Sequence, residues 1–356
     1  MFSMSDYLDK RSRYYEQTLF AKKSIAVDFS TNYLDAAIVE TITTKLSYCP
    51  LLLCEAQEIL PSITDINTSG STSIVYKVIF GQECLAVKIR KDKMHSAFFK
   101  NEIEKRCNEN IKMLPEMFFA SEKNGVIISK WIEGKTLKNI DTRYVHISLE
   151  KILSLTADMI KEGYYDDDFT PSNIIYTKEC AKVIDAGTLF RCNTKQLNPY
   201  CDGLSMQNMF SRLLYRNVMV YLIRLGRIGC EDTSFKIYKD FMPKFIDALK
   251  SIGELLSSNH LVSFWNNYRD AYEQNILSSF IRDKYLCHMY ILSENLADNY
   301  YDNHTTTRLK ELIMLLENNY DSLSSNEHLI FEDINFDKKD CLLKYKAILE
   351  DVCKFK

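Results

Sequence analysis

One block of β-type sequence in an otherwise helical chain constrains the fold most. Residues 63 to 90 are rich in Ile, Val, Tyr and Thr, and Gly81 with its neighbours marks a hairpin turn. A charged helical pattern follows at 95 to 110, and the apolar run at 126 to 134 indicates another buried strand that leads into a turn. The sequence therefore predicts a small antiparallel sheet with a helix inserted between its strands.

Helical periodicity dominates on both sides of this block. The segment 1 to 60 contains long helical patterns, and residues 148 to 163 predict an amphipathic helix with Gly163 suited to its C-terminal cap. After Asp185 almost the whole chain has a helical pattern. The spacing of a core-facing helix is shown by Leu309, Leu312, Ile313 and Leu316. Because 356 residues are many for one core, we expect an α+β protein with two lobes or an extension.

The composition limits the classes of partner. A formal net charge of -3 gives no general attraction to nucleic acid or an anionic membrane, and no apolar run approaches the ~20 residues that cross a bilayer. The 11 cysteines include no pair at a zinc-ligand spacing, and their odd, scattered set fits a reducing compartment. We therefore expect a cytoplasmic protein with no nucleic-acid partner and no transmembrane segment. Delivery into the cytosol of a host cell stays open.

The segment from 163 to 187, GYYDDDFTPSNIIYTKECAKVIDAG, carries the strongest chemical signal. Asp168 and Asn173 are five residues apart in a short loop that can point both side chains into one cleft, and Asp185 ends an apolar run that predicts a strand. Two of these oxygen ligands can share a magnesium ion, and the third can accept a hydrogen bond from an attacking hydroxyl. This is the spacing that a phosphoryl-transfer site needs.

The order of these motifs resembles that of the protein-kinase superfamily. D-x4-N followed by D-A-G is similar to the family motifs H-R-D-L-x-x-x-N and D-F-G. The resemblance implies that Asp168 is the catalytic aspartate and that Asn173 and Asp185 bind magnesium. It covers about residues 63 to 190.

The resemblance also implies a bilobal protein-kinase-like fold. A helical N-terminal extension at 1 to 60 would precede a small lobe at 61 to 130, which contains the antiparallel sheet. Residues 131 to 356 would form an enlarged, mainly helical C-terminal lobe whose last part is divergent.

The nucleotide side of the site follows from the same resemblance. The turn at Ser69 to Ser73 resembles the phosphate-covering loop, although only the central glycine of G-x-G-x-x-G is present. Lys88 in LAVKI resembles the strand lysine that neutralises the non-transferred phosphates of ATP. The residues of this part expected to contact ATP are Gly70, Ser71, Ser73, Val75 and Lys88.

Lys88 needs an acidic partner, and the helix that begins near Ser96 offers two. Glu102 follows a Phe pair by one turn and suits a residue that faces inward from an amphipathic helix, so we favour it. Glu104 is the alternative. Both can instead belong to a solvated face together with neighbouring lysine and arginine residues.

The segment IISKWIEGKTL, from 127 to 137, resembles the hinge between the lobes of a kinase. The resemblance implies that Ser129 is the gatekeeper, that the Lys130 carbonyl accepts a hydrogen bond from adenine, and that the Ile132 N–H donates one to it. A plain strand and turn is the alternative.

Several departures from the family pattern narrow the resemblance. Asp166 and Asp167 replace the motif histidine and arginine, Thr170 replaces the lysine of ordinary Ser/Thr kinases, and no A-P-E segment follows Asp185. Activation by loop phosphorylation is therefore not expected. The loop DFTPSN is instead similar to the D-L-T-x-S-N type of atypical kinases, which include sugar and lipopolysaccharide kinases.

These observations predict an ATP- and Mg²⁺-dependent atypical kinase that phosphorylates the Ser or Thr hydroxyls of proteins, as bacterial effector kinases with similarly reduced motifs do. A small-molecule acceptor, such as a sugar, a lipopolysaccharide core or an aminoglycoside, is a close second choice. A pseudokinase that binds nucleotide without turnover, or an enzyme that transfers AMP, would carry a similar set of motifs.

A second resemblance is weaker. Residues 24 to 40 and the sequence VIDAGT are similar to the phosphate hairpins of the actin and sugar-kinase ATPase superfamily. Phe29, however, stands where the backbone must approach a phosphate, and this interpretation leaves Lys88 unexplained. We therefore expect residues 24 to 40 to form a helix or strand that packs on the small lobe.

Overall fold

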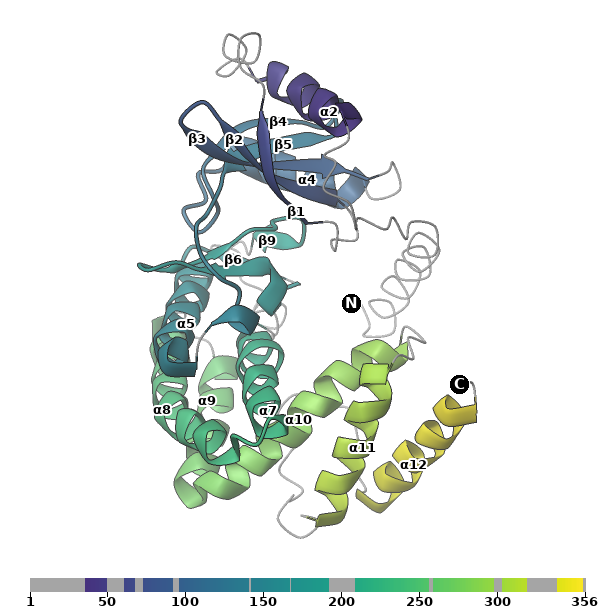
Figure 1. Ribbon diagram of the computed structural model, residues 1–356. Helices are drawn as coiled ribbons and strands as arrows, with labels where there is room; N and C mark the ends of the chain where they lie inside the picture. Colours follow the sequence, from purple (N-terminus) through teal and green to yellow (C-terminus); the bar gives the residue numbers. More distant parts are fainter. Residues whose placement is uncertain are drawn as a thin grey trace.

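The computed structural model describes most of the chain as a mixed α+β protein, with a small antiparallel sheet and a mostly helical remainder (Figure 1). This confirms the expected α+β class and the small antiparallel sheet. The described residues are 36–49, 61–67, 73–91, 96–140, 142–166, 168–191, 209–255, 259–297, 303–318 and 338–354.

The sheet has five strands in the order β1-β2-β3-β5-β4, and all neighbouring strands are antiparallel. The strands are β1 (Ser62–Asn67), β2 (Ser73–Phe80), β3 (Glu83–Arg90), β4 (Met117–Ser121) and β5 (Val126–Lys130). The expected hairpin joins β2 to β3, where Gly81 takes a positive φ of 61° that glycine adopts without strain. Strand β4 was not predicted from the sequence as a separate strand.

One face of the sheet forms a hydrophobic core with helix α2 (Ala36–Ser47), which lies across the top of the sheet in Figure 1. Ile42 and Leu46 of α2 are completely buried against the apolar strand residues. A helical segment that packs on the sheet is therefore confirmed for residues 36 to 40, and the helix continues to residue 47. The rest of the segment 24 to 40, with Phe29, lies outside the described residues.

Helix α4 (Ser96–Asn108) connects β3 to β4 and confirms the charged helical pattern at 95 to 110. Phe99 is 2% exposed, and the Arg90 guanidinium carbon of β3 lies 5.9 Å from the centre of its ring. These contacts hold α4 against the sheet near the end of β3. They place its Glu102 within reach of Lys88.

The second hydrophobic core lies among the helices after the sheet. Its helices are α5 (Val145–Lys161), the π-helix η4 (Arg212–Val218), α7 (Met219–Arg227), α8 (Glu231–Leu255), α9 (Asn259–Gln274), α10 (Ile276–Ala297), α11 (Asn303–Asn318) and α12 (Lys338–Lys354). Helix α5 begins three residues before the predicted start, and Gly163 takes φ 81° just after its end, as expected of a C-terminal cap. The four spaced residues of α11 are all buried.

Two short ribbons lie between the sheet and the helices. Strand β6 (Tyr164–Asp166) pairs with β9 (Leu189–Arg191), and β7 (Ile174–Tyr176) pairs with β8 (Ala181–Val183). Strand β9 is an exception to the helical pattern expected after Asp185. The turn between β6 and β7 carries Asp168, and the turn between β8 and β9 carries Asp185, so the two ribbons bring the candidate catalytic residues together.

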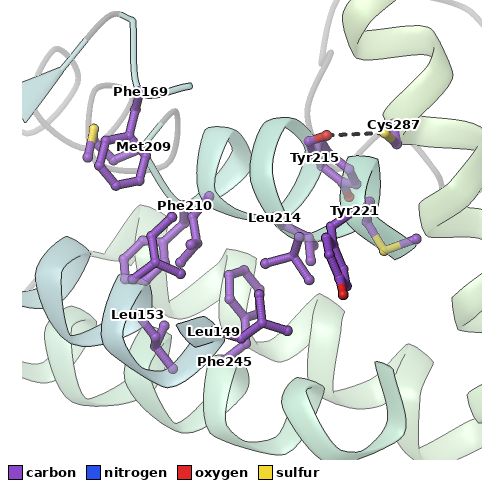
Figure 2. Packing of buried hydrophobic residues seen from close by; sticks show 14 of the residues in the cluster. Leu149, Leu153, Phe169, Met209, Phe210, Leu214, Tyr215, Tyr221, Phe245 and Cys287 are labelled. Atoms are coloured by element: carbon purple, nitrogen blue, oxygen red, sulfur yellow. Dashed lines mark hydrogen bonds between the residues drawn. The ribbon is translucent and has the colours of Figure 1, made fainter. Parts of the chain in front are cut away.

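The residue after Asp168 fixes the loop to the helical core. Phe169 is completely buried beside Met209 (Figure 2). Its carbonyl accepts a hydrogen bond of 2.9 Å from the Asn217 side chain of η4. Burial of a phenylalanine side chain contributes about 2 to 3 kcal/mol to stability. The loop is thus anchored to the core while Asp168 itself stays exposed to solvent.

Candidate functional site

The sheet face opposite the α2 core carries the residues expected to meet a nucleotide. Because registered partners on antiparallel strands share a face, Val75 of β2, Lys88 of β3 and Ile127 of β5 form one row across the sheet. Ala86 and Ser129 form the neighbouring row. Small side chains therefore lie next to Lys88 on this face. Ala86 is a candidate nucleotide-contacting residue that the sequence interpretation missed.

Lys88 lies at the centre of a buried ion cluster. Its Nζ is 2.6 Å from Glu102 Oε2 of α4 and 3.1 Å from Asp185 Oδ2, which follows β8. The lysine therefore joins the sheet, α4 and the D-A-G turn. Glu104 is exposed and lies 3.7 Å from Lys100, so the choice of Glu102 as the partner of Lys88 is confirmed.

Arg106 completes this cluster from the next turn of α4. Its Nε donates to Glu102 Oε1 at 3.0 Å, and its Nη1 donates to the Pro115 carbonyl at 3.2 Å. Both oxygens of the buried Glu102 carboxylate are thus occupied. The i, i+4 spacing of Glu102 and Arg106 is visible in the sequence, but there it indicated only a possible solvated face.

The electrostatics of the cluster keep Lys88 and Asp185 charged. Burial alone would lower the pKa of Lys88, but the nearby carboxylates of Asp185 and Glu102 outweigh it and raise that pKa. Burial alone would raise the pKa of Asp185, but Lys88 and the Gly187 N–H outweigh it and lower that pKa. Asp185 is therefore an anion at neutral pH, the form in which a carboxyl group binds magnesium.

The Asp168 loop is held by its own side chains. Asn173, in the 3-10 turn η3 (Pro171–Asn173), donates from Nδ2 to Asp168 Oδ2 at 2.9 Å and to the Asp168 carbonyl at 3.0 Å. The amide oxygen of the Asn173 side chain takes no part in these hydrogen bonds to the loop. In turn, the Ile184 N–H donates to the Asn173 carbonyl at 2.9 Å, so the loop is tied to the segment that leads to Asp185.

The surroundings of Asp168 shift the pKa of its carboxyl group in opposite directions. Desolvation raises the pKa of its carboxyl group, the guanidinium groups of Arg216 and Arg212 of η4 lower it, and the negative charge of Asp185 raises it further. The net shift is upward. Such a shift makes a carboxylate a better hydrogen-bond acceptor for a hydroxyl proton. The two arginines are residues that the sequence interpretation did not identify, because only the fold brings η4 to the loop.

The D-A-G turn is also tied to α4. Gly187 N–H donates to Asp185 Oδ1 at 3.0 Å, and its carbonyl accepts a hydrogen bond of 2.7 Å from the Asn101 side chain. Asn101 directly precedes Glu102 in α4. The turn is thus fixed to the same helix that fixes Lys88.

The expected hinge lies at the end of β5. The Lys130 N–H donates to the Glu116 carbonyl and the Trp131 N–H donates to the Cys84 carbonyl, both at 2.8 Å. Among the described residues, the Ile132 N–H has no hydrogen-bond partner. This agrees with the role expected of Ile132 as a donor to a ligand, whereas Lys130 offers only its carbonyl.

Asp166, which stands at the position of the motif histidine, is buried beneath the Asp168 loop. Its side chain is 1% exposed, and its Oδ1 accepts hydrogen bonds from the Asp168 N–H at 3.0 Å and the Thr188 hydroxyl at 2.7 Å. Burial raises its pKa to about 7, although both hydrogen bonds act to lower it. Nothing in the sequence indicated that this aspartate, the first of three in a row, would be buried.

The remaining predicted residues have mixed outcomes. Ser73 is buried and Val75 is half-buried on β2, and the register places Val75 on the sheet face of Lys88. Gly70 and Ser71 lie outside the described residues, as does Asp167. The phosphate-covering turn at 69 to 73 therefore stays a prediction, and its last residue, Ser73, begins β2.

The residues that the structure brings together fit the chemistry of magnesium and a polyphosphate. Magnesium prefers oxygen ligands and commonly takes one or two carboxylates together with phosphate oxygens and water. The Asp185 carboxylate and the Asn173 amide oxygen supply ligands of this type. Within the described residues, no group of three His, Cys, Asp or Glu side chains is arranged to hold a metal ion, so a substrate phosphate would have to complete the coordination.

The comparisons with protein families and with curated proteins identify no relative of this chain. No protein-family model matches the chain, and no curated protein matches it. The geometry of the site is therefore what supports a function. Separately, none of the helices in the described parts of the chain has both the length and the apolar character required to span a membrane.

Proposed function

We propose that this protein is an ATP- and Mg²⁺-dependent phosphotransferase of the atypical kinase type. The observation that carries the proposal is the contact of Lys88 Nζ with both Glu102 and Asp185, at 2.6 and 3.1 Å. In kinases a strand lysine paired with a helix glutamate, and a metal-binding aspartate beside them, must be in place together for phosphoryl transfer.

The fold supports the same proposal. A five-stranded antiparallel sheet with a helix between its third and fourth strands precedes a helical part with its own hydrophobic core. We assign these to the small and large lobes of a bilobal kinase-like fold, with a boundary near residue 130. The sheet core includes α2, so the small lobe in this assignment begins before residue 61, which was its expected start.

Each residue of the site then has a chemical task. Lys88 neutralises the non-transferred phosphates, and Glu102 with Arg106 holds the lysine in position. Asn173 and Asp185 would hold magnesium, which supplies charge neutralisation for the phosphate oxygens. Asp168 orients the acceptor hydroxyl and accepts its proton. The raised pKa of Asp168 suits this role, since a stronger base accepts a proton more readily.

The Ser or Thr hydroxyl of a protein is the first choice of acceptor. The helical part is large, and its size suits a macromolecular substrate more than a small one. A small-molecule hydroxyl remains the second choice. Both acceptors would use the same site residues, so the choice between them depends on the substrate assay and not on the catalytic residues.

Incubation with labelled ATP and magnesium tests the proposal against the competing functions. Transfer of label from γ-labelled ATP to protein, to an added small-molecule hydroxyl or to water supports phosphoryl transfer. Transfer from α-labelled ATP alone would show an AMP transferase instead. Tight nucleotide binding with no transfer from either nucleotide would show a pseudokinase.

A further inference from the structure

The carboxylate of Asp166 joins the two turns that carry the proposed catalytic residues. The Asp168 N–H and the Thr188 hydroxyl both donate to the same oxygen, Asp166 Oδ1, at 3.0 and 2.7 Å. Thr188 comes three residues after Asp185. A single buried oxygen atom therefore connects the backbone of Asp168 to the D-A-G turn.

The surroundings of Asp166 hold this oxygen rigidly. Asp166 pairs with Leu189 in the β6 and β9 ribbon, and its N–H contacts the Met209 sulfur at 3.1 Å. Its second oxygen, Oδ2, is buried and has no hydrogen-bond partner within the described residues. Buried polar atoms normally have partners, so the site keeps a carboxylate at some cost in stability. What the carboxylate contributes is the pair of hydrogen bonds that Oδ1 accepts.

We propose that Asp166 is a positioning residue, which sets the place of Asp168 relative to Asp185 through its hydrogen bonds to the Asp168 N–H and the Thr188 hydroxyl. This inference rests on the proposed phosphotransferase function. It gives a task to the residue that stands in place of the motif histidine. The position of that histidine is thus filled by a hydrogen-bond acceptor, which links the two turns without an aromatic side chain.

Because one oxygen atom of Asp166 accepts both hydrogen bonds, loss of the acceptor can be tested separately from loss of the negative charge. An asparagine at 166 keeps Oδ1 as the acceptor and loses only the negative charge. A leucine keeps a similar volume and loses both hydrogen bonds. A purely structural role would lower thermal stability without changing turnover per folded molecule, whereas a positioning role lowers kcat.

The test measures γ-phosphoryl transfer with saturating ATP in the full-length wild-type protein and in matched variants. Asp166→Leu is expected to lower kcat about 100-fold, because small displacements of a catalytic group cost about this much. Asp166→Asn is expected to stay within about threefold of the wild type, since it retains the acceptor oxygen. The KM for ATP is expected to stay unchanged in both, because neither change touches Lys88 or Asp185.

Thr188 provides a second, milder pair in case Asp166→Leu does not fold. Thr188→Val removes the hydroxyl and keeps the shape, and we expect about a tenfold loss of kcat, roughly the worth of one hydrogen bond. Thr188→Ser restores the hydroxyl and should restore kcat. Thermal unfolding of each variant separates loss of folding from loss of turnover.

Three outcomes would overturn the inference. Wild-type turnover in both Asp166→Leu and Thr188→Val would show that the link has no role in positioning. A loss of kcat in Asp166→Asn as large as that in Asp166→Leu would show that the charge, not the hydrogen-bond acceptor, is what matters. Absence of γ-phosphoryl transfer by the wild-type protein would overturn the proposed function and this inference together.

Discussion

The chain buries charged groups in two regions, and the two differ in access to solvent. In the candidate site, the Asp185 side chain is 36% exposed although it contacts the buried Lys88. In the helical core, Asp283 of α10 is completely buried, accepts from the Tyr238 hydroxyl at 2.6 Å and pairs with Arg282 at 3.1 Å. The comparison separates an open cluster, around Lys88 and Asp185, from a closed cluster, around Arg282 and Asp283. Of the two, only the open cluster has a charged side chain with substantial exposure to solvent.

In the closed cluster, the buried charges are balanced by groups of the protein alone. Burial raises the pKa of Asp283, and Arg282 and the Tyr238 hydroxyl act against this shift. Both charged groups there have their partners inside the helical core, so we expect this cluster to affect stability alone. In the site, by contrast, Asp168 and Asp185 both reach solvent and together carry more negative charge than Lys88 neutralises.

The largest expected effect is beside the open cluster, at the proposed base. Asp168→Ala should lower the rate of γ-phosphoryl transfer by about 10³-fold, because it removes the group that accepts the hydroxyl proton. Nucleotide affinity should stay nearly the same, since Asp168 is not among the ion-pair partners of Lys88. Single-turnover kinetics and a nucleotide titration measure the two quantities. Full activity in this variant would contradict the assignment.

A matched pair on α4 tests the buried part of the open cluster. Glu102→Gln should lower transfer by about 100-fold, because the ion pair that positions Lys88 loses its charge. Glu104→Gln is the control and should stay within about twofold, since its carboxylate is exposed and its ion pair with Lys100 is a weak surface pair. Equal losses in the two variants would argue against a special role for Glu102.

The closed cluster should respond in stability and not in turnover. Asp283→Asn leaves Arg282 in the core without its carboxylate and should lower the free energy of unfolding by about 3 kcal/mol. Asp270→Asn, on the exposed pair with Arg269, is the control and should change it by less than about 0.5 kcal/mol. Chemical denaturation measures both. A fall in kcat per folded Asp283→Asn molecule would mean that the two clusters are not independent.

A pH dependence of stability should come from Asp166. Its pKa is about 7 in the folded protein and near 3.8 when unfolded, so the folded state holds the proton more tightly. The stabilisation is therefore present at low pH and is lost as pH rises from about 4 to about 7. Relative to Asp166→Asn, the wild-type free energy of unfolding should fall by about 3 kcal/mol over this range.

The measurement for this prediction is denaturant unfolding of both proteins at pH 4.5 and pH 8. The charged groups that act on Asp166 are Asp168 and Asp185, which raise its pKa, and Lys105 of α4 lies close enough to interact with it. A constant difference between wild type and Asp166→Asn across this range would show that Asp166 does not titrate there.

The fold class and the main site residues could be predicted from the sequence because each leaves a local pattern. The alternation of β2 and β3 and the turn at Gly81 indicated the hairpin, and the spacing of Asp168, Asn173 and Asp185 indicated the loop. Glu102 could be favoured over Glu104 from the amphipathic pattern of one helix. These features depend on residues close together in the chain.

Features that depend on distant residues could not be predicted. The burial of Asp166 depends on Thr188 and on Met209, and its neighbours in the sequence are also aspartates, so no local pattern separates it from them. The arginines of η4 reach Asp168 only because Asn217 and Phe169 tie the π-helix to the loop.

Magnesium-dependent nucleotide binding tests the central claim most directly. A non-hydrolysable ATP analogue would be titrated calorimetrically into wild type and Asp185→Asn, with and without Mg²⁺. We predict that the wild type binds the analogue and that Mg²⁺ increases its affinity. In Asp185→Asn the affinity should be at least about tenfold lower, but only when Mg²⁺ is present, because the variant lacks one charged magnesium ligand. No binding by the wild type, or binding that Mg²⁺ and Asp185→Asn leave unchanged, would contradict the account.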